Sequence, residues 1–347
     1  MITIMVIHVF GQDLSVSIAP TLSQYSDKQD VEVILNYKNQ GSKKVLIYKW
    51  YFPNQQLFHP LFEMTRDGKR VAYIGPVAKR RTPIAEDMVS LESGKSISTR
   101  IQLSSVYNMT ETGNYAIRFN VTIDQMLSTS SRLLQIESDV ISDSRLISPS
   151  ATLFAVGRSN ALITESARVA TQGKSLIPSY YKCSTTQETM ISAAIKSAAS
   201  YSLSSIQYLS SVSSSGTTRY TTWFGTYSSS NLATLKTQYN RINDVFNTKS
   251  MSFDCTCTEE NTYAYVYPSI PYKIHLCPAF WSAPTTGTDT KGGTLVHETS
   301  HFTAVARTSD YAYGQSACKT LAKSNPTKAL GNADSHEYFS ENYPKLL

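Results

Sequence analysis

The 347-residue chain lacks the features that mark membrane-spanning, fibrous or disordered proteins. It contains no run of 18 apolar residues, so a membrane-spanning helix is excluded. Glycine (15) and proline (13) are scarce and 41% of the residues are hydrophobic, which excludes a collagen-like, coiled-coil or disordered chain. The length fits two domains. The apolar opening segment, residues 1–11, is expected to be either the remnant of a secretory signal or a first strand.

The chain also lacks a concentrated positive charge. Its 32 basic and 26 acidic residues give a net charge of +6, and the basic residues are spread along the sequence. The densest run is Lys79-Arg80-Arg81, which we interpret as part of a solvated surface. Nucleic-acid binding needs a focused basic patch, so we expect no nucleic-acid partner.

Cysteine is absent from the first 182 residues, and all five cysteines follow. The spacing of Cys255 and Cys257, with Cys277 further on, does not fit the common structural zinc patterns. Two disulfides and one spare thiol fit better, which favours an oxidising compartment and a secreted protein. We expect the spare thiol, Cys318, to be buried in a helix.

Residues 1–158 are predicted to form an antiparallel, immunoglobulin-like β-sandwich. Short β-branched or alternating segments are separated by turn signals, with no helical period between them. The expected strands are residues 14–18, 31–37, 44–50, 97–103 and 115–123. No residue of this domain has the pattern of a catalytic group.

Residues 159–179 have a small, polar composition that predicts a linker, and residues 180–347 then form a second domain. Apolar residues recur at helical spacing over 191–209 and 232–246. Aromatic residues 220–227 and residues 262–267 are expected to be strands. This domain is therefore predicted to be helix-dominated α+β.

Residues 297–301 have the pattern H-E-x-x-H. On a helix, His297 and His301 lie on one face and can direct nitrogens at one metal ion. Glu298 lies beside that face, where it can hold a water molecule. Apolar neighbours and the preceding Gly292-Gly293 support a buried helix that begins there. The alternative is a pair of structural histidines. Catalytic zinc usually takes a third protein ligand, and Asp310 follows after a turn.

From these residues onward, the sequence resembles the aspzincin metallopeptidases, whose HExxH motif is followed by an aspartate ligand and a Tyr-Gly pair, here Asp310 and Tyr313-Gly314. Within that family it is most similar to the peptidyl-lysine metalloendopeptidases. The resemblance covers residues 180–347. Further matching segments are 221–225, 253–257, 279–281, 292–294 and 332–339.

The resemblance implies a zincin-type catalytic domain, and a zinc endopeptidase with one zinc ion per chain, held by His297, His301 and Asp310. It implies Glu298 as the general base and Tyr313 as a donor to the developing oxyanion. It also implies the disulfides Cys183–Cys255 and Cys257–Cys277. The sequence departs from the family at Arg307, where a glycine is usual, and this puts the turn before Asp310 in question.

Asp334 and Glu337 are three residues apart, so on a helix they face the same way. Two acids at the wall of a cleft attract an extended cation, and in the resembling peptidyl-lysine enzymes matching residues form the pocket for the lysine after the scissile bond. The alternative is that Asp334 caps the helix and Glu337 is solvated. Glu341 fits either interpretation, whereas His336 is expected to be structural.

Three functional hypotheses follow. The first is a secreted, monomeric enzyme, made as a zymogen, that cuts lysine-containing proteins or peptides. The second is a deuterolysin-like protease with broader specificity. The third is a β-sandwich binding protein with an inactive peptidase-like domain. Under the first, residues 1–158 are a prosegment, removed by a cut in the linker, for example before Lys174. The competing view is a permanent binding module.

Overall fold

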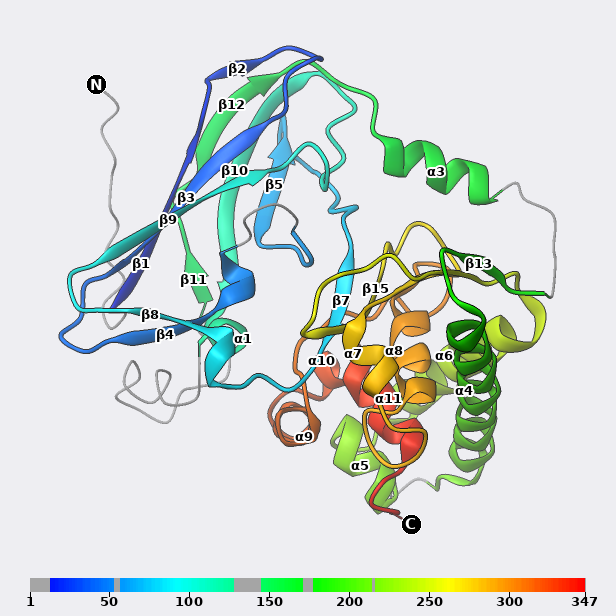
Figure 1. The fold of residues 1–347 in the computed structure, drawn as a ribbon. Helices are drawn as coiled ribbons and strands as arrows, with labels where there is room; N and C mark the ends of the chain where they lie inside the picture. Colours follow the sequence, from blue (N-terminus) through cyan, green and yellow to red (C-terminus); the bar gives the residue numbers. More distant parts are fainter. Residues whose placement is uncertain (1–12, 53–56, 128–144, 171–176, 214–215, 347) are drawn as a thin grey trace. The chain divides into compact units, whose positions relative to one another are not determined.

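The computed structural model describes residues 13–52, 57–127, 145–170, 177–213 and 216–346. The opening segment and Lys174 lie outside these residues, so the expectations for them stay predictions. The described chain divides into two compact units (Figure 1). The first contains residues up to Gly75 and Pro83–Thr164. The second combines Glu165–Leu347 with a short earlier segment, Pro76–Thr82.

The first unit is rich in β-structure, as the alternating sequence predicted. A three-stranded sheet has the order β1 (Leu14–Pro20), β3 (Glu32–Asn39), β9 (Ser96–Gln102). A larger sheet has the order β2 (Gln24–Tyr25), β12 (Ala151–Ala155), β10 (Gly113–Thr122), β5 (Phe62–Arg66), β6 (Lys69–Arg70), with β11 (Arg145–Ile147) beside β10. A separate pair joins β4 (Val45–Tyr48) and β8 (Met88–Leu91).

One hydrophobic core is shared by the strands of the first unit. Val33 and Leu35 of β3 and Ile117 and Phe119 of β10 are fully buried in the same cluster. Every second residue along these strands faces it, because side chains alternate between the two faces of a strand. The pairing of β2 with β12 is parallel, so the expectation of a purely antiparallel domain is wrong at this edge. β2 and β12 are far apart in the sequence. The alternation of apolar and polar residues within a strand does not reveal whether it pairs parallel or antiparallel with such a distant partner.

The second unit contains a five-stranded mixed sheet and a set of helices. The strand order is β13 (Ser179–Tyr181), β14 (Ser252–Asp254), β16 (Lys273–Leu276), β15 (Thr262–Val266), β7 (Val77–Arg80). β13, β14 and β16 run parallel, whereas β15 is antiparallel to both of its neighbours. The edge strand β7 comes from Pro76–Thr82, about 180 residues earlier in the chain than its partner β15.

Helices make up most of the second unit, as predicted. They are α4 (Thr185–Ser211), α5 (Thr218–Phe224), α6 (Ser229–Thr248), α7 (Pro278–Ser282), α8 (Lys291–His301), α9 (Gln315–Ser324), α10 (Pro326–Leu330) and α11 (Ala333–Glu341). In Figure 1, α8 and α11 lie side by side, and α8 contacts both the sheet, at β15 and β7, and the long helix α4. Among the described residues, no helix has both the length and the hydrophobicity needed to cross a membrane.

Two local expectations change. The aromatic run expected as a strand at 220–227 begins as helix α5, because Thr217 caps it and Tyr220, Trp223 and Phe224 recur at helical spacing on a buried face. The stretch expected as a linker contains helix α3 (Ala161–Ala170). At its start, the side-chain oxygen of Asn160 accepts a hydrogen bond from the Leu162 N–H. Aromatic residues made α5 resemble a strand, and small polar composition concealed α3.

Candidate active site

The predicted metal-binding histidines lie on the buried helix α8. Thr290 caps this helix by accepting a hydrogen bond from the Gly293 N–H (2.8 Å). A Cβ at Gly293 would collide with the carboxylate of Glu341, so glycine allows α11 to approach α8 closely. The Nε2 atoms of His297 and His301, one helical turn apart, are 3.1 Å from each other. The helix thus directs both imidazoles to one point.

The chain returns to that point through a turn after α8. Arg307 adopts a left-handed conformation (φ 54°), the region that glycine prefers, so this chain makes the turn with an arginine in a glycine-like conformation. Asp310 Oδ1 then lies 3.2 Å from His297 Nε2 and 3.4 Å from His301 Nε2. The substitution at Arg307 therefore leaves Asp310 beside both histidines.

These three side chains fit a zinc ion by donor type and spacing. Two imidazole nitrogens and one carboxylate oxygen are a common catalytic zinc set. Tetrahedral ligands at about 2.0–2.1 Å from zinc are separated from each other by about 3.3 Å. The three separations here, 3.1, 3.2 and 3.4 Å, match that spacing. All three side chains are buried from solvent by at least 95%.

The other ring nitrogens lie beside protein oxygen atoms, which orients the metal-facing atoms. His301 Nδ1 lies 2.9 Å from the Thr308 carbonyl oxygen. His297 Nδ1 lies 2.8 Å from Asp334 Oδ1 and 3.4 Å from Glu337 Oε2. An acceptor on one ring nitrogen fixes the tautomer that presents the other as a ligand. Asp334 thus contacts a candidate ligand, a role that sequence reasoning missed.

Glu298 and Tyr313 both contact the backbone of strand β7. Glu298 Oε1 accepts a hydrogen bond from the Lys79 N–H at 3.2 Å, and the Tyr313 hydroxyl donates to the Ala78 carbonyl oxygen at 3.0 Å. Burial raises the pKa of Glu298 to about 7. The two candidate catalytic groups therefore lie on either end of one peptide bond, between Ala78 and Lys79.

The predicted acidic pair forms a buried pocket that holds a lysine. The Lys79 Nζ atom lies 2.7 Å from Glu337 Oε2 and 3.5 Å from Asp334 Oδ1. It also lies 3.0 Å from Oδ1 of Asp289, a carboxylate just before α8 that sequence reasoning missed. Burial alone would lower the pKa of Lys79, but the nearby carboxylates raise it well above its usual value.

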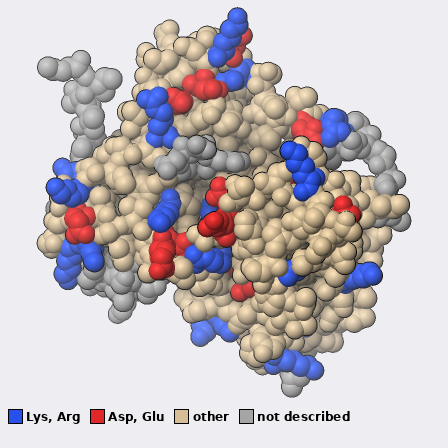
Figure 2. Space-filling view, viewed as in Figure 1, with Lys and Arg blue, Asp and Glu red and all other residues tan. Residues whose placement is uncertain are grey.

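The interpretation of Lys79-Arg80-Arg81 as solvated surface is therefore wrong for Lys79, whose side chain is 0% exposed. The sequence indicated no catalytic group in the first 158 residues, and it also gave no sign that Lys79 would contact this site. The run was visible in the sequence, but its burial depends on strand pairing across about 180 residues. On the face shown in Figure 2, basic residues are dispersed among uncharged and acidic ones.

Three nearby residues contribute to the structure around the site. Glu341 accepts hydrogen bonds from the N–H groups of Asp289 and Thr290 (3.1 and 2.7 Å), so it supports the start of α8. His336 is buried, with Nδ1 3.0 Å from the Asn332 carbonyl oxygen, as expected of a structural histidine. Cys318 is a free, buried thiol, also as expected.

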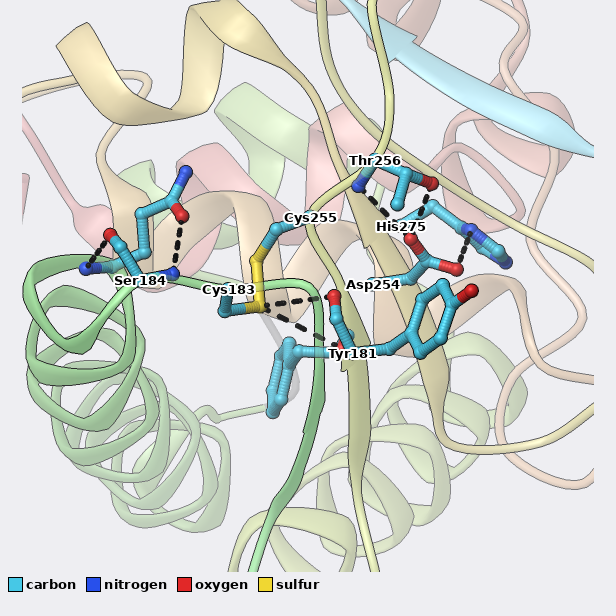
Figure 3. The surroundings of a disulfide bond; sticks show 9 residues. Tyr181, Cys183, Ser184, Asp254, Cys255, Thr256 and His275 are labelled. Carbon is cyan, nitrogen blue, oxygen red and sulfur yellow. Dashed lines mark hydrogen bonds and ion pairs between the residues drawn. A yellow bond between two sulfur atoms is a disulfide. The ribbon is translucent and has the colours of Figure 1, made fainter.

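Two disulfides join loops around the sheet of the second unit. Cys183 is bonded to Cys255, and Cys257 to Cys277, the pairs that the resemblance implies. Figure 3 shows the first bond linking the ends of β13 and β14 beside Asp254, which accepts hydrogen bonds from Thr256. The Cys183–Cys255 bond holds these strand ends next to the start of α4.

The chain is similar to several known proteins. Residues 208–341 match the family model described as lysine-specific metallo-endopeptidase, of the aspzincin group. The chain is 38% identical to an extracellular protease of Aeromonas hydrophila over 91% of its own length and 89% of the relative's. It is 39% identical to a peptidyl-Lys metalloendopeptidase of Grifola frondosa over 80% of this chain and 75% of that protein. The corresponding enzyme of Pleurotus ostreatus is 50% identical over 47% of this chain and 96% of its own length.

Proposed function

Because the chain belongs to the aspzincin family of zinc metalloendopeptidases, we propose that it is a secreted endopeptidase that hydrolyses peptide bonds on the amino side of lysine. The observation that carries this specificity is the ammonium group of Lys79 among the carboxylates of Asp289, Asp334 and Glu337. Proteins and peptides that contain lysine are the proposed substrates, and the proposed active form is a monomer.

We assign one zinc ion per chain to His297, His301 and Asp310, on the spacing of their donor atoms. When bound, zinc supplies a Lewis acid that activates water and polarises the peptide carbonyl. Asp334 and the Thr308 carbonyl oxygen keep the two imidazoles oriented toward that position.

Glu298 is the proposed general base. It takes the proton of the attacking water and delivers it to the leaving amine. The contact between Glu298 Oε1 and the Lys79 N–H supports this role, because it places the carboxylate within reach of the nitrogen that follows a scissile carbonyl. The Tyr313 hydroxyl, which donates to the Ala78 carbonyl oxygen, is the proposed donor to the oxyanion.

The pocket favours lysine for reasons of charge and shape. Three carboxylates in a buried site repel an acidic side chain. A neutral side chain would leave carboxylate oxygens of the pocket without a partner. An ammonium group is a compact charge with three donors, and oxygens of the three acids surround Nζ at 2.7, 3.0 and 3.5 Å. The rings of Tyr263 and Tyr338, 5.1 and 5.7 Å from Nζ, add cation–π attraction. Arginine, with a wider planar head, fits this arrangement less well.

Secretion and processing are part of the proposal. Two disulfides favour an oxidising compartment, and a relative is named an extracellular protease. We keep residues 1–158 as an immunoglobulin-like prosegment, 159–179 as the processed linker and 180–347 as the catalytic domain. N-terminal sequencing of the secreted enzyme tests this division: a start near Ser179 supports removal, and a start before Gln12 contradicts it.

Matched peptides test the specificity. Three fluorogenic peptides should differ in one residue after the cut, which is lysine, arginine or norleucine. We expect kcat/KM for lysine to exceed that for norleucine by about 10- to 100-fold, the value of a hydrogen-bonded charge in a buried site. Equal rates for the three peptides would favour the broader deuterolysin-like function. A Glu298→Gln chain, purified identically, controls for contaminating proteases.

A further inference from the structure

Strand β7 occupies the edge of the catalytic sheet as an added strand. It pairs antiparallel with β15, with Ala78 opposite Tyr265 and Lys79 opposite Ala264. Addition of an extended segment to a sheet edge is a common way for a protein to bind a peptide. The flanking Arg81 continues the contact, because its guanidinium donates to Asn261 Oδ1 (2.9 Å).

The backbone and side chain of β7 meet every group that a substrate would need. The Ala78 carbonyl oxygen contacts Tyr313, the Lys79 N–H contacts Glu298, and the Lys79 ammonium lies in the acidic pocket. These three contacts define one register, in which the peptide bond between Ala78 and Lys79 occupies the position of a scissile bond. A second peptide cannot use the same β15 edge and pocket while β7 is there.

We propose that Val77–Arg80 is a built-in, substrate-like inhibitor, anchored by Lys79, that blocks the active site of the uncut chain. This inference rests on the proposed lysine specificity and extends it to regulation. Activity toward other proteins then requires that β7 leave the sheet edge, which processing of the chain would allow.

An internal segment has an advantage over free substrates. The residues on both sides of Pro76–Thr82 belong to the first unit, so the inhibitor strand is tethered at both ends. Tethering through short connections gives an effective concentration of about millimolar, and a dissolved substrate must exceed this to compete at equal affinity. Inhibition therefore persists in the intact chain and is lost after removal of the segment.

The test measures the initial rate of freshly purified chains whose intact mass confirms that they are uncut. A lysine peptide is the substrate. Wild type and a Lys28→Ala control, which removes an exposed lysine from a turn of the first unit, should start slowly and accelerate as processing proceeds. Lys79→Ala should start at least tenfold faster, because truncating one partner of a buried charge pair weakens binding by that much or more. A fast start by uncut wild type, or an equally slow start by a folded Lys79→Ala chain, would overturn the proposal.

A second measurement decides the question if Lys79→Ala does not fold. A synthetic peptide of residues 74–84 is added to the activated enzyme. It should raise the apparent KM for the lysine peptide without lowering kcat, and its Lys79→Ala counterpart should be at least tenfold weaker. If neither peptide competes, the inhibitor assignment is wrong. A different result would show that the lysine specificity itself is wrong. In that case both peptides would inhibit the activated enzyme equally, and the enzyme would cut norleucine peptides as fast as lysine peptides.

Discussion

The two units of the molecule bury different chemistry. The core of the first unit consists of aliphatic and aromatic side chains, such as Val33, Ile117 and Phe119. The centre of the second unit buries His297, Glu298 and the ion-paired Lys79 and Glu337. Burial of apolar groups stabilises a fold, whereas burial of charges costs free energy unless each is paired. The comparison teaches that the first unit is organised for stability and the second for a reaction.

The largest expected effect is a loss of catalysis without a loss of fold. Glu298→Gln keeps the size of the side chain but removes the base, so kcat should fall by about 10²- to 10⁴-fold. Bound zinc and the thermal unfolding temperature should stay close to wild type. If the Glu298→Gln enzyme retained more than a tenth of the wild-type kcat, Glu298 would not be the general base.

Tyr313→Phe should have the next largest effect. It deletes the hydroxyl that contacts the Ala78 carbonyl oxygen, and loss of one oxyanion donor lowers kcat by about 10²- to 10³-fold. Steady-state kinetics on a lysine peptide measure this, and KM should change little. An unchanged kcat with a raised KM would make Tyr313 a binding group only.

A pair of glutamates sharpens the comparison within the second unit. In the activated enzyme, Glu337→Gln should reduce the preference for lysine over norleucine by about tenfold or more, because its carboxylate contacts the lysine ammonium directly. Glu341→Gln is the matched control on the same helix. Glu341 accepts from the backbone of Thr290, so its loss should lower stability and leave the preference unchanged. Equal changes in preference for both variants would contradict the assigned pocket.

The smallest effect on cleavage is expected from the first unit. Phe119→Ala leaves a cavity in its core and should destabilise that unit by about 3–5 kcal/mol, measured by urea unfolding. The ratio of lysine to norleucine cleavage should not change once the variant is activated, because the proposed processing removes residues 1–158, Phe119 included. A shifted ratio would show that the first unit takes part in substrate selection.

The parts of the site that lie close together in sequence were predictable. His297, Glu298 and His301 follow from helical spacing, and the pair Asp334 and Glu337 follows from the same rule on α11. The residue that completes the pocket, Lys79, was not predictable as such. Its position depends on the long-range pairing of β7 with β15, and no local period records which distant strands meet.

The fold shows the same division between local and long-range information. Alternation predicted the strands of the first unit and helical spacing predicted α4 and α6, because both patterns are local. The parallel pairing of β2 with β12 and the role of Asp289 both depend on contacts between distant segments. These features required the structure.

Digestion of a denatured protein by the activated enzyme tests the central assignment most directly. Mass spectrometry of the products identifies the residue at every new amino terminus. If three acids select lysine beside the zinc-binding histidines, lysine should begin almost all new fragments, and the Glu298→Gln chain should produce none. New termini distributed among many residue types, with lysine at its ordinary abundance in the substrate, would contradict the account.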